Sequence, residues 1–116
     1  MDARTLRIID LIKYDCGQDL SLTKMARAVN LSPWSLCHMF KRDTHFSPVQ
    51  FVRRLRMQEA KELLETTFLS VKEVMTKVGV HDESHFVRDF EKAHGLSPAR
   101  YRTIHNHLST QTSNIG

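Results

Sequence analysis

The sequence contains an internal repeat of about fifty residues, and this repeat limits the possible folds more than any other feature. Residues 20–52 align with residues 69–101 at an offset of 49, which becomes 50 after a one-residue slip. The aligned pairs include Leu22 with Val71, Met25 with Val74, Val29 with Val78, Leu36 with Phe86, Phe40 with Phe90 and Phe51 with Tyr101. Two copies are fewer than a solenoid needs. The repeat therefore predicts two related small subdomains.

Apolar residues recur at helical spacing in every segment, without the strict alternation of a half-buried strand. Leu6, Ile9 and Ile12 form the first predicted stripe. Further stripes lie within residues 22–29, 36–40, 51–64, 71–78, 86–93 and 101–108. We therefore expect an all-α fold of about seven helices.

The starts and ends of these helices are also marked in the sequence. Ser32, Ser47 and Ser97 each place an N-cap hydroxyl directly before a proline. The spacing of Ser47 to Gln50 and of Ser70 to Glu73 fits the capping box. Gly95 lies where a left-handed residue is needed to end the sixth helix.

These signals predict one domain over residues 1–109, built from two helix-turn-helix units. The first unit spans about residues 21–45 and the second about residues 70–94, and a long linker helix at about 47–66 joins them. A closing helix follows at about 97–108. Residues 110–116 are polar and small, which favours a disordered tail.

Composition excludes several classes of protein. No apolar run approaches the ~20 residues of a transmembrane helix, and no N-terminal segment has the pattern of a secretory signal. Two cysteines, Cys16 and Cys37, are too few for a disulfide scaffold or a four-cysteine zinc site. We expect a reduced, cytoplasmic protein with no cofactor and no membrane partner.

The positive charge is concentrated in the first half of the chain. The formal net charge is +4, and residues 20–66 have eight Lys or Arg against four acids. Residues 69–102 have six against five. Residues 32–56 contain five basic side chains, namely Lys41, Arg42, Arg53, Arg54 and Arg56. A solvated helix face often has such a composition, so charge alone leaves nucleic-acid binding and an ordinary surface equally open.

Spaced residues in both repeats form a more specific pattern. The second repeat has Gly79, Ser84, His85, Phe86, Arg88, Phe90, Lys92, Gly95, Ser97, Pro98, Tyr101 and Arg102. The first has Ala26, Ser32, Pro33, Leu36, Phe40, Lys41, Arg42, Ser47, Pro48, Phe51, Leu55, Arg56, Ala60, Leu63 and Leu64. With these residues, positions 6–102 resemble the DNA-binding domain of the AraC/XylS family of bacterial transcription regulators.

The resemblance implies a monomeric domain that binds double-stranded DNA by sequence and regulates bacterial transcription, as an activator in preference to a repressor. It implies two recognition helices in successive major grooves of an asymmetric site of about 20 base pairs, with RNA polymerase as a further partner and the bound protein at the nucleoid. Many family members carry an effector or dimerisation domain before this one. Residues 2–8 therefore begin either a short stand-alone regulator or an excised C-terminal domain, and both stay open.

Four residues depart from the family's pattern. His45 stands at a position that usually has glycine, Met75 replaces a small alanine, and Val80 replaces a phenylalanine. These three affect packing or turn detail. Glu91 replaces a lysine, which removes an expected phosphate contact and weakens the second unit's hold on DNA.

By resemblance, one face of each recognition helix reads base edges. In the first unit this face holds Trp34, Cys37 and His38, and Lys41, Arg42, Arg53 and Arg54 are candidate phosphate contacts. In the second unit it holds Glu83, Ser84, Val87 and Arg88, of which Arg88 is the best candidate to read guanine. Each assignment has a structural alternative. Trp34 could be a core residue. Glu83 could interact favourably with the helix dipole, and Arg88 could pair with Glu83 or Glu91. Arg53, Arg54 and Arg56 could simply be solvated on the surface of the linker helix.

Other functions find less support in the sequence. His81 and His85 are four residues apart, but the run between them lacks the Glu that a zinc protease places directly after its first His. Neither a phosphate-binding glycine loop nor a nucleophile elbow is present, so we expect no enzyme. An all-helical adaptor would share the core pattern, but it would not need two matched polar faces behind two matched turns.

Overall fold

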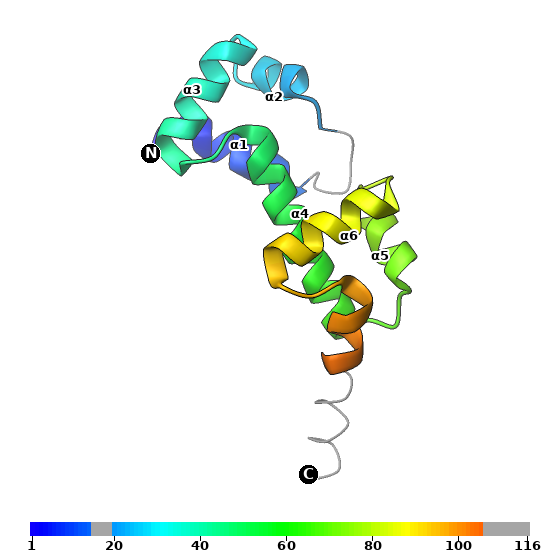
Figure 1. The fold of residues 1–116 in the computed structure, drawn as a ribbon. Helices are drawn as coiled ribbons and strands as arrows, with labels where there is room; N and C mark the ends of the chain where they lie inside the picture. The colour runs from blue at the N-terminus through cyan, green and yellow to red at the C-terminus, as the bar shows by residue number, and fades with distance from the viewer. Residues whose placement is uncertain (15–19, 106–116) are drawn as a thin grey trace. The chain divides into compact units, whose positions relative to one another are not determined.

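The computed structural model describes residues 1–14 and 20–105, and the regular secondary structure within them consists only of helices (Figure 1). The labelled helices are α1 (Ala3–Tyr14), α2 (Leu22–Ala28), α3 (Pro33–Thr44), α4 (Pro48–Thr66), α5 (Val71–Lys77) and α6 (Glu83–His94). A further helix occupies residues 98–105. The predicted all-α class is confirmed. Cys16, the end of the closing helix and the predicted tail lie outside the described residues.

The chain divides into two compact units, Met1–Arg56 and Met57–Gly116, and the division falls inside α4. Each unit has the same local plan: a seven-residue helix, a tight turn and a twelve-residue helix. In the first unit these helices are α2 and α3, and in the second they are α5 and α6. Each pair is a helix-turn-helix, as the repeat predicted.

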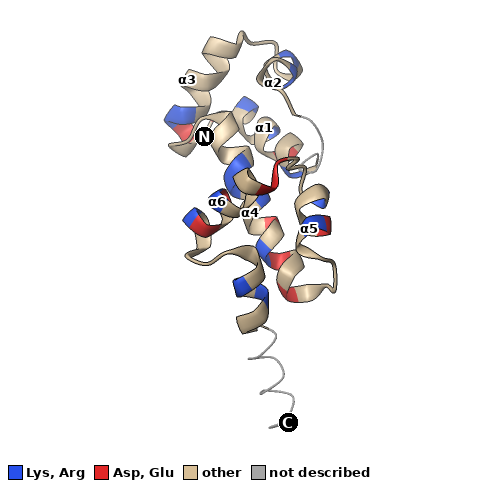
Figure 2. Ribbon diagram, turned by 45° about the vertical axis from the view of Figure 1, so that its right-hand side comes forward, with Lys and Arg blue, Asp and Glu red and all other residues tan. Residues whose placement is uncertain are grey.

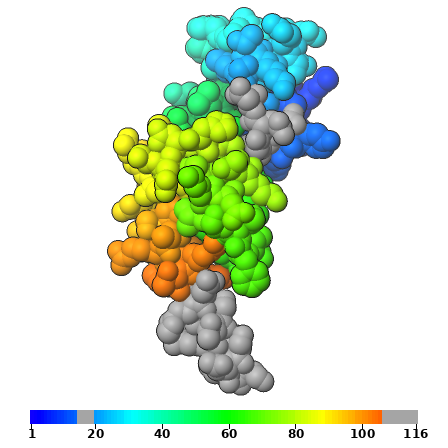
Figure 3. Space-filling view, turned by 90° about the vertical axis from the view of Figure 1, so that its right-hand side faces the viewer, coloured from blue at the N-terminus to red at the C-terminus, as the bar shows by residue number. Residues whose placement is uncertain are grey.

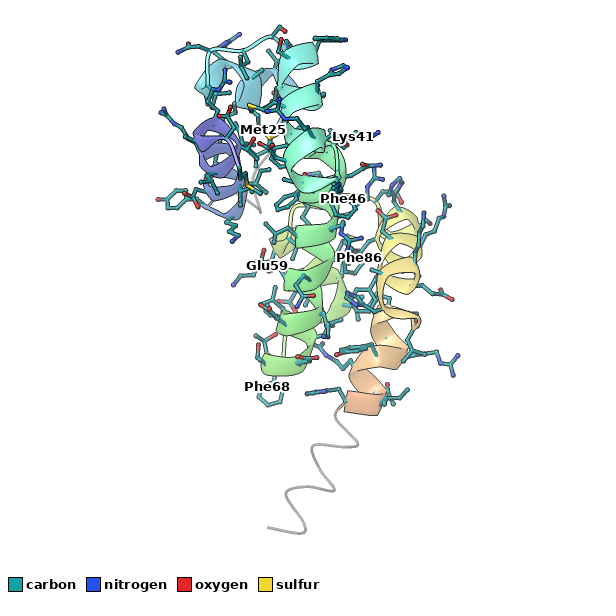
Figure 4. The ribbon with its side chains drawn as sticks, turned by 90° about the vertical axis from the view of Figure 1, so that its left-hand side faces the viewer. Met25, Lys41, Phe46, Glu59, Phe68 and Phe86 are labelled. Carbon is teal, nitrogen blue, oxygen red and sulfur yellow. The ribbon has the colours of Figure 1, made fainter. Side chains whose placement is uncertain are left out.

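The first unit has its own apolar core, to which all four of its helical segments contribute. Met25 of α2 is fully buried and points toward α1 and α3 (Figure 4). Leu36 and Phe40 of α3 are also fully buried, and Phe40 meets Phe51 of α4 edge to face with ring centroids 5.3 Å apart. These contacts hold α3 by one face and leave its other face free.

The prediction for the first helix is confirmed at Ile12, which is fully buried, and at Ile9, which packs against the core, but it is wrong at Leu6. Leu6 is 51% exposed, and the buried residues of α1 are Thr5, Ile8 and Ile12. The reason is a polar contact: the Thr5 hydroxyl donates to Asp43 Oδ2 at 2.6 Å. A buried hydroxyl is tolerated when it has such a partner, and Thr5 therefore takes a core position that the apolar pattern had given to Leu6.

The second unit has a separate core between the C-terminal half of α4, α5 and α6. Phe86 and Phe90 are fully buried, and Phe86 lies between α4 and α6 (Figure 4). The other buried members are Met57, Ala60, Leu64, Val74, Met75 and Val78. As in the first unit, one face of the twelve-residue helix is committed to packing.

The predicted helix caps are confirmed by hydrogen bonds. The Ser32, Ser47 and Ser97 hydroxyls accept from the backbone amides of Ser35, Gln50 and Arg100. Both predicted capping boxes form, because the side chains of Gln50 and Glu73 also accept from the amides of Ser47 and Ser70. The backbone amide and hydroxyl of Ser70 hold the pKa of Glu73 below its ordinary value.

Left-handed residues end the helices at equivalent places in the two units. Asn30 (φ 57°) and Gly79 (φ 85°) follow the short helices, and His45 (φ 71°) and Gly95 (φ 81°) follow the long ones. His45 and Gly95 each donate their backbone N–H to the carbonyl four residues back, at 2.8 and 2.7 Å. The stop predicted at Gly95 is confirmed, and the same geometry occurs at His45, although histidine is strained there.

Candidate nucleic-acid interface

Helix α3 presents a polar and aromatic face opposite its buried one. Trp34 and His38 are exposed and Cys37 is half-buried. Because Leu36 and Phe40 fix the other side of the helix in the core, these side chains are held outward on a rigid element. This is the arrangement that a recognition helix needs.

Trp34 is 69% exposed, so it is not a core residue. Its ring lies against that of His38, with centroids 3.8 Å apart and an angle of 32° between the planes. His38 Nδ1 also lies 2.8 Å from the carbonyl oxygen of Trp34. The two rings therefore form one unit on the surface, and an exposed indole without a packing role is available to a partner.

A hollow of about 530 Å³ adjoins this ring pair. Its lining residues are Arg4, Leu31, Trp34, Ser35, His38, Met39 and Arg42. Sequence reasoning missed Arg4, because nothing in the pattern of α1 placed it near α3. Arg4 pairs with Asp2 at 2.9 Å, and this hydrogen-bonded pair lowers the pKa of Asp2 to about 2.

The last turn of α3 is cationic, as the blue segment in Figure 2 shows. Lys41 is exposed and points away from the core (Figure 4). Arg42 is also exposed, and its Nε lies 3.4 Å from Asp43 Oδ1. Asp43 further accepts from Thr5 and from the Asp2 backbone, and chiefly the Thr5 hydroxyl keeps the pKa of Asp43 low. Asp43 thus anchors α1 to the cationic end of α3.

The early part of α4 supplies further cations. Arg53 and Arg54 are exposed, and Arg56 is half-buried. The Arg54 guanidinium lies 4.5 Å above the centre of the Phe46 ring, a cation–π contact that orients it without neutralising its charge.

Helix α6 has the equivalent outward face in the second unit. Glu83, Ser84 and Arg88 are exposed and Val87 is half-buried. In the space-filling view the atoms of α6 (yellow) lie open on the surface, above those of the helix at residues 98–105 (Figure 3). The opposite face carries Phe86 and Phe90 into the core.

The N-cap of α6 is Asp82, whose carboxylate accepts from the His85 amide at 3.0 Å. Sequence reasoning missed this cap, although an Asp before an apolar periodic run is its ordinary signal. Glu83 follows in the first turn, where its charge is favourable for the helix dipole. The dipole role of Glu83 therefore stands beside its predicted base contact.

Arg88 makes no ion pair with Glu83 or Glu91 in the described part of the chain. The salt-bridge alternative for Arg88 is thus not realised among the described residues, and its side chain is exposed. A guanidinium is suited to the two acceptors of a guanine edge. Acidic segments also lie on α6 (Figure 2), where Glu83 and Glu91 are exposed.

The histidines form no metal centre within the described residues. His81 precedes α6, and His85 Nε2 lies 3.6 Å from Asp89 Oδ2. Across residues 1–14 and 20–105, no three His, Cys, Asp or Glu side chains gather closely enough to hold a metal ion. None of the helices described is long and apolar enough to cross a membrane.

Two residues of the family pattern hold the last described helix in place. The Tyr101 hydroxyl donates to the Glu65 carboxylate, and Arg102 donates to the carbonyls of Leu69 and Thr67. Burial and the Glu65 charge raise the pKa of Tyr101 to about 12. These residues thus fasten residues 98–105 to the end of α4, away from the predicted base contacts.

Comparison with known proteins identifies the family. A family model described as a helix-turn-helix domain matches residues 25–104. The arabinose operon regulatory protein of Escherichia coli is 33% identical over 84 residues, which are 72% of this chain and 29% of that protein. The chain belongs to the AraC/XylS family. Its fold is that of the AraC-type DNA-binding domain.

Two further similarities support this family. The transcriptional regulator MtrA of Neisseria gonorrhoeae is 38% identical over 101 residues, which are 87% of this chain and 34% of MtrA. The solved C-terminal domain of AraT, a response regulator from Geobacillus stearothermophilus, has a TM-score of 0.84 and 33% identity, covering 89% of this chain and 86% of that one. The chain spans only 12% to 34% of the first curated relatives it matches.

Proposed function

We propose that this AraC-type domain regulates bacterial transcription by binding double-stranded DNA in a sequence-specific way, as an activator and not as an enzyme. One observation carries the proposal. In each unit, a helix that follows a tight turn buries an apolar face and exposes a polar one. An adaptor would need no such repetition. The proposed domain spans residues 1–109, with the unit boundaries predicted from the sequence.

The proposed DNA site is asymmetric and spans about 20 base pairs. Helix α4 has 19 residues and is therefore about 28 Å long. Successive major grooves on one side of a duplex lie ~34 Å apart. The presence of one helix-turn-helix in each unit supports a site with two elements. The two exposed faces differ in sequence, so their half-sites are expected to differ as well.

The proposed contacts fall into two classes. Base edges are assigned to Trp34, Cys37, His38, Glu83, Ser84, Val87 and Arg88. Phosphates are assigned to Lys41, Arg42, Arg53 and Arg54. The exposure of Trp34 and the absence of an ion pair at Arg88 within the described residues support the first class. The cationic last turn of α3 supports the second.

Further partners are proposed from the family. As an activator, the protein contacts RNA polymerase, and it acts in the cytoplasm, at the nucleoid when bound. The name of the arabinose operon regulatory protein links that relative to control of an operon. Because the matched relatives are much longer than this chain, we also propose that an effector or dimerisation domain accompanies it.

Selection from a random duplex pool tests the proposed function, followed by salt-titrated binding of the enriched duplexes. We expect a split, asymmetric motif whose two elements lie about one helical turn apart, and binding that weakens steeply with salt. Enrichment of one short element would mean that only one unit reads bases. No enrichment, with weak and salt-insensitive binding, would refute the proposal and favour an adaptor.

A further inference from the structure

The hydrogen bond between His38 and Trp34 determines which atom of the imidazole carries a proton. His38 Nδ1 lies 2.8 Å from the backbone carbonyl oxygen of Trp34. A carbonyl oxygen only accepts, so Nδ1 must donate and must carry the hydrogen. In a neutral imidazole only one nitrogen is protonated. Neutral His38 therefore presents Nε2 as a hydrogen-bond acceptor.

The orientation of this ring is held from two sides. The Trp34 indole lies against the imidazole, with ring centroids 3.8 Å apart, and the hydrogen bond to the Trp34 carbonyl turns Nδ1 toward the helix backbone. His38 is exposed, and Nε2 has no hydrogen-bond partner among the described residues. The acceptor is thus directed outward and is unoccupied by the protein itself.

Two arginines line the hollow together with His38, Arg4 of α1 and Arg42 of α3. Lys41 follows His38 by three residues on α3. Each arginine is already paired with a carboxylate, Arg4 with Asp2 and Arg42 with Asp43. No carboxylate is among the residues that line the hollow. We consider the neutral ring, in which one nitrogen donates and the other accepts.

An acceptor in the major groove selects a particular class of base. Adenine offers the N6 amino group there and cytosine the N4 amino group, whereas guanine N7 and O6 and thymine O4 are acceptors themselves. We propose that His38 Nε2 accepts a hydrogen bond from the exocyclic amine of an adenine or a cytosine, and so determines one position of the operator. This inference rests on the proposed DNA-binding function and specifies its chemistry.

The two recognition helices would then read opposite kinds of groups. Arg88 has only donors, which suit the acceptors of guanine, whereas neutral His38 offers an acceptor to an amine. If His38 instead donated a hydrogen bond to guanine or to phosphate through Nε2, the ring would need a second proton. The bond to the Trp34 carbonyl already uses the single N–H of the neutral form.

Removal of single functional groups from the DNA tests the inference. Duplexes are first selected with the wild-type chain and with His38→Ala, and the position whose preference disappears in His38→Ala is identified. At that position the amine is then deleted, with purine in place of adenine or 2-pyrimidinone in place of cytosine. The matched control duplex keeps the amine and lacks the keto oxygen of the paired base. Binding is measured at one pH and one salt concentration for all duplexes and both proteins.

We expect amine deletion to weaken wild-type binding about threefold to tenfold, the effect of one net hydrogen bond. The same deletion should weaken binding of the His38→Ala protein much less. Its effect on base pairing is the same for both proteins and therefore cancels when the two losses are compared. Keto deletion should affect both proteins equally. Coupling of His38 to the keto oxygen would overturn the inference, as would equal losses for both proteins or no position that depends on His38.

These outcomes are separate from failure of the proposed function. If the wild-type chain enriches no duplex at all, DNA reading itself is refuted, and the role of His38 with it. If a motif is enriched but the amine is irrelevant, only the acceptor role of His38 is refuted. Because His38 is exposed, His38→Ala should keep the helical circular dichroism of the wild type, and the Arg88-dependent position should keep its preference.

Discussion

His45 ends α3 and Gly95 ends α6, and both are left-handed. We expect Gly95→Ala to lower the stability of the fold and His45→Gly to raise it. Gly95 has φ 81° and ψ −8°, and a Cβ placed on it would meet no atom within 4 Å. Gly95→Ala therefore introduces no clash, and only its backbone cost remains. A left-handed L-residue costs about 1–2 kcal/mol, and alanine returns about 0.4–1 kcal/mol by restricting the unfolded chain. The expected net loss is about 1 kcal/mol.

The same arithmetic predicts a gain at the equivalent position of the first unit. His45 has φ 71°, is exposed, and donates only its backbone N–H, which glycine retains. His45→Gly removes the left-handed strain, which stabilises the folded state. Glycine also gives the unfolded chain more conformational entropy, which offsets part of that gain. Histidine tolerates this region better than alanine does, so the expected gain is smaller, about 0.5 kcal/mol.

Thermal and urea unfolding followed by far-ultraviolet circular dichroism measure both changes. For a domain of this size, a loss of 1 kcal/mol lowers the midpoint by about 4 °C. Gly95→Asn serves as the matched control, because asparagine adopts the left-handed conformation more readily, and it should lose less than Gly95→Ala. A Gly95→Ala protein as stable as the wild type would refute the strain argument, and so would a less stable His45→Gly protein.

Four further predictions concern the interface and the anchors of each unit. Arg88→Ala should cost roughly 1–3 kcal/mol on the preferred duplex and relax one base position, and equal losses on random duplexes would contradict that role. Lys41→Ala should weaken binding to all duplexes and reduce the salt slope by about one, whereas an unchanged slope would exclude a phosphate contact. Asp43→Ala leaves the buried Thr5 hydroxyl without its acceptor, which costs about 1–3 kcal/mol of stability. Adding Thr5→Val should restore part of the melting temperature. No restoration would mean that the unpaired hydroxyl is not the cause of the loss. The pKa of Tyr101 is raised from 10.0 to about 12, so folding favours the neutral phenol. The contribution of Tyr101 to the free energy of unfolding should be present below pH 10 and lost as the pH rises toward 12. Tyr101→Phe should remove that alkaline decline in stability, and an identical decline in both proteins would refute the assignment.

Local signals were sufficient to predict most of the fold because each has a short-range physical cause. The Ser32 and Ser47 caps depend on hydroxyls three residues from the amides they satisfy. The stop at Gly95 depends on one backbone conformation. Phe86 and Phe90 were assigned to the core by their spacing alone, and both are fully buried. None of these inferences required knowledge of a distant contact.

The Asp82 cap was missed although its signal is local, but two other missed features depend on contacts between residues far apart in the chain. Thr5 is buried because Asp43, 38 residues away, accepts from its hydroxyl. Arg4 borders the hollow beside Trp34 for the same reason, since α1 is anchored at the end of α3. A polar side chain is assigned to the surface by any apolar pattern, and only its distant partner reveals that it belongs inside.

The divergence of the two repeats bears on how affinity and specificity are divided between them. The proposed phosphate contacts, among them Lys41 and Arg54, all belong to the first unit, whereas α6 combines Arg88 with the acidic Glu83 and Glu91. Phosphate contacts release counterions and determine the salt dependence of binding, while a bidentate arginine contributes base discrimination. We therefore expect loss of the phosphate contacts in the first unit to reduce affinity for every duplex, and losses in α6 to act mainly on the choice of sequence. The acceptor at His38 makes the first unit selective as well, because affinity for phosphate alone would not distinguish an amine from a keto group.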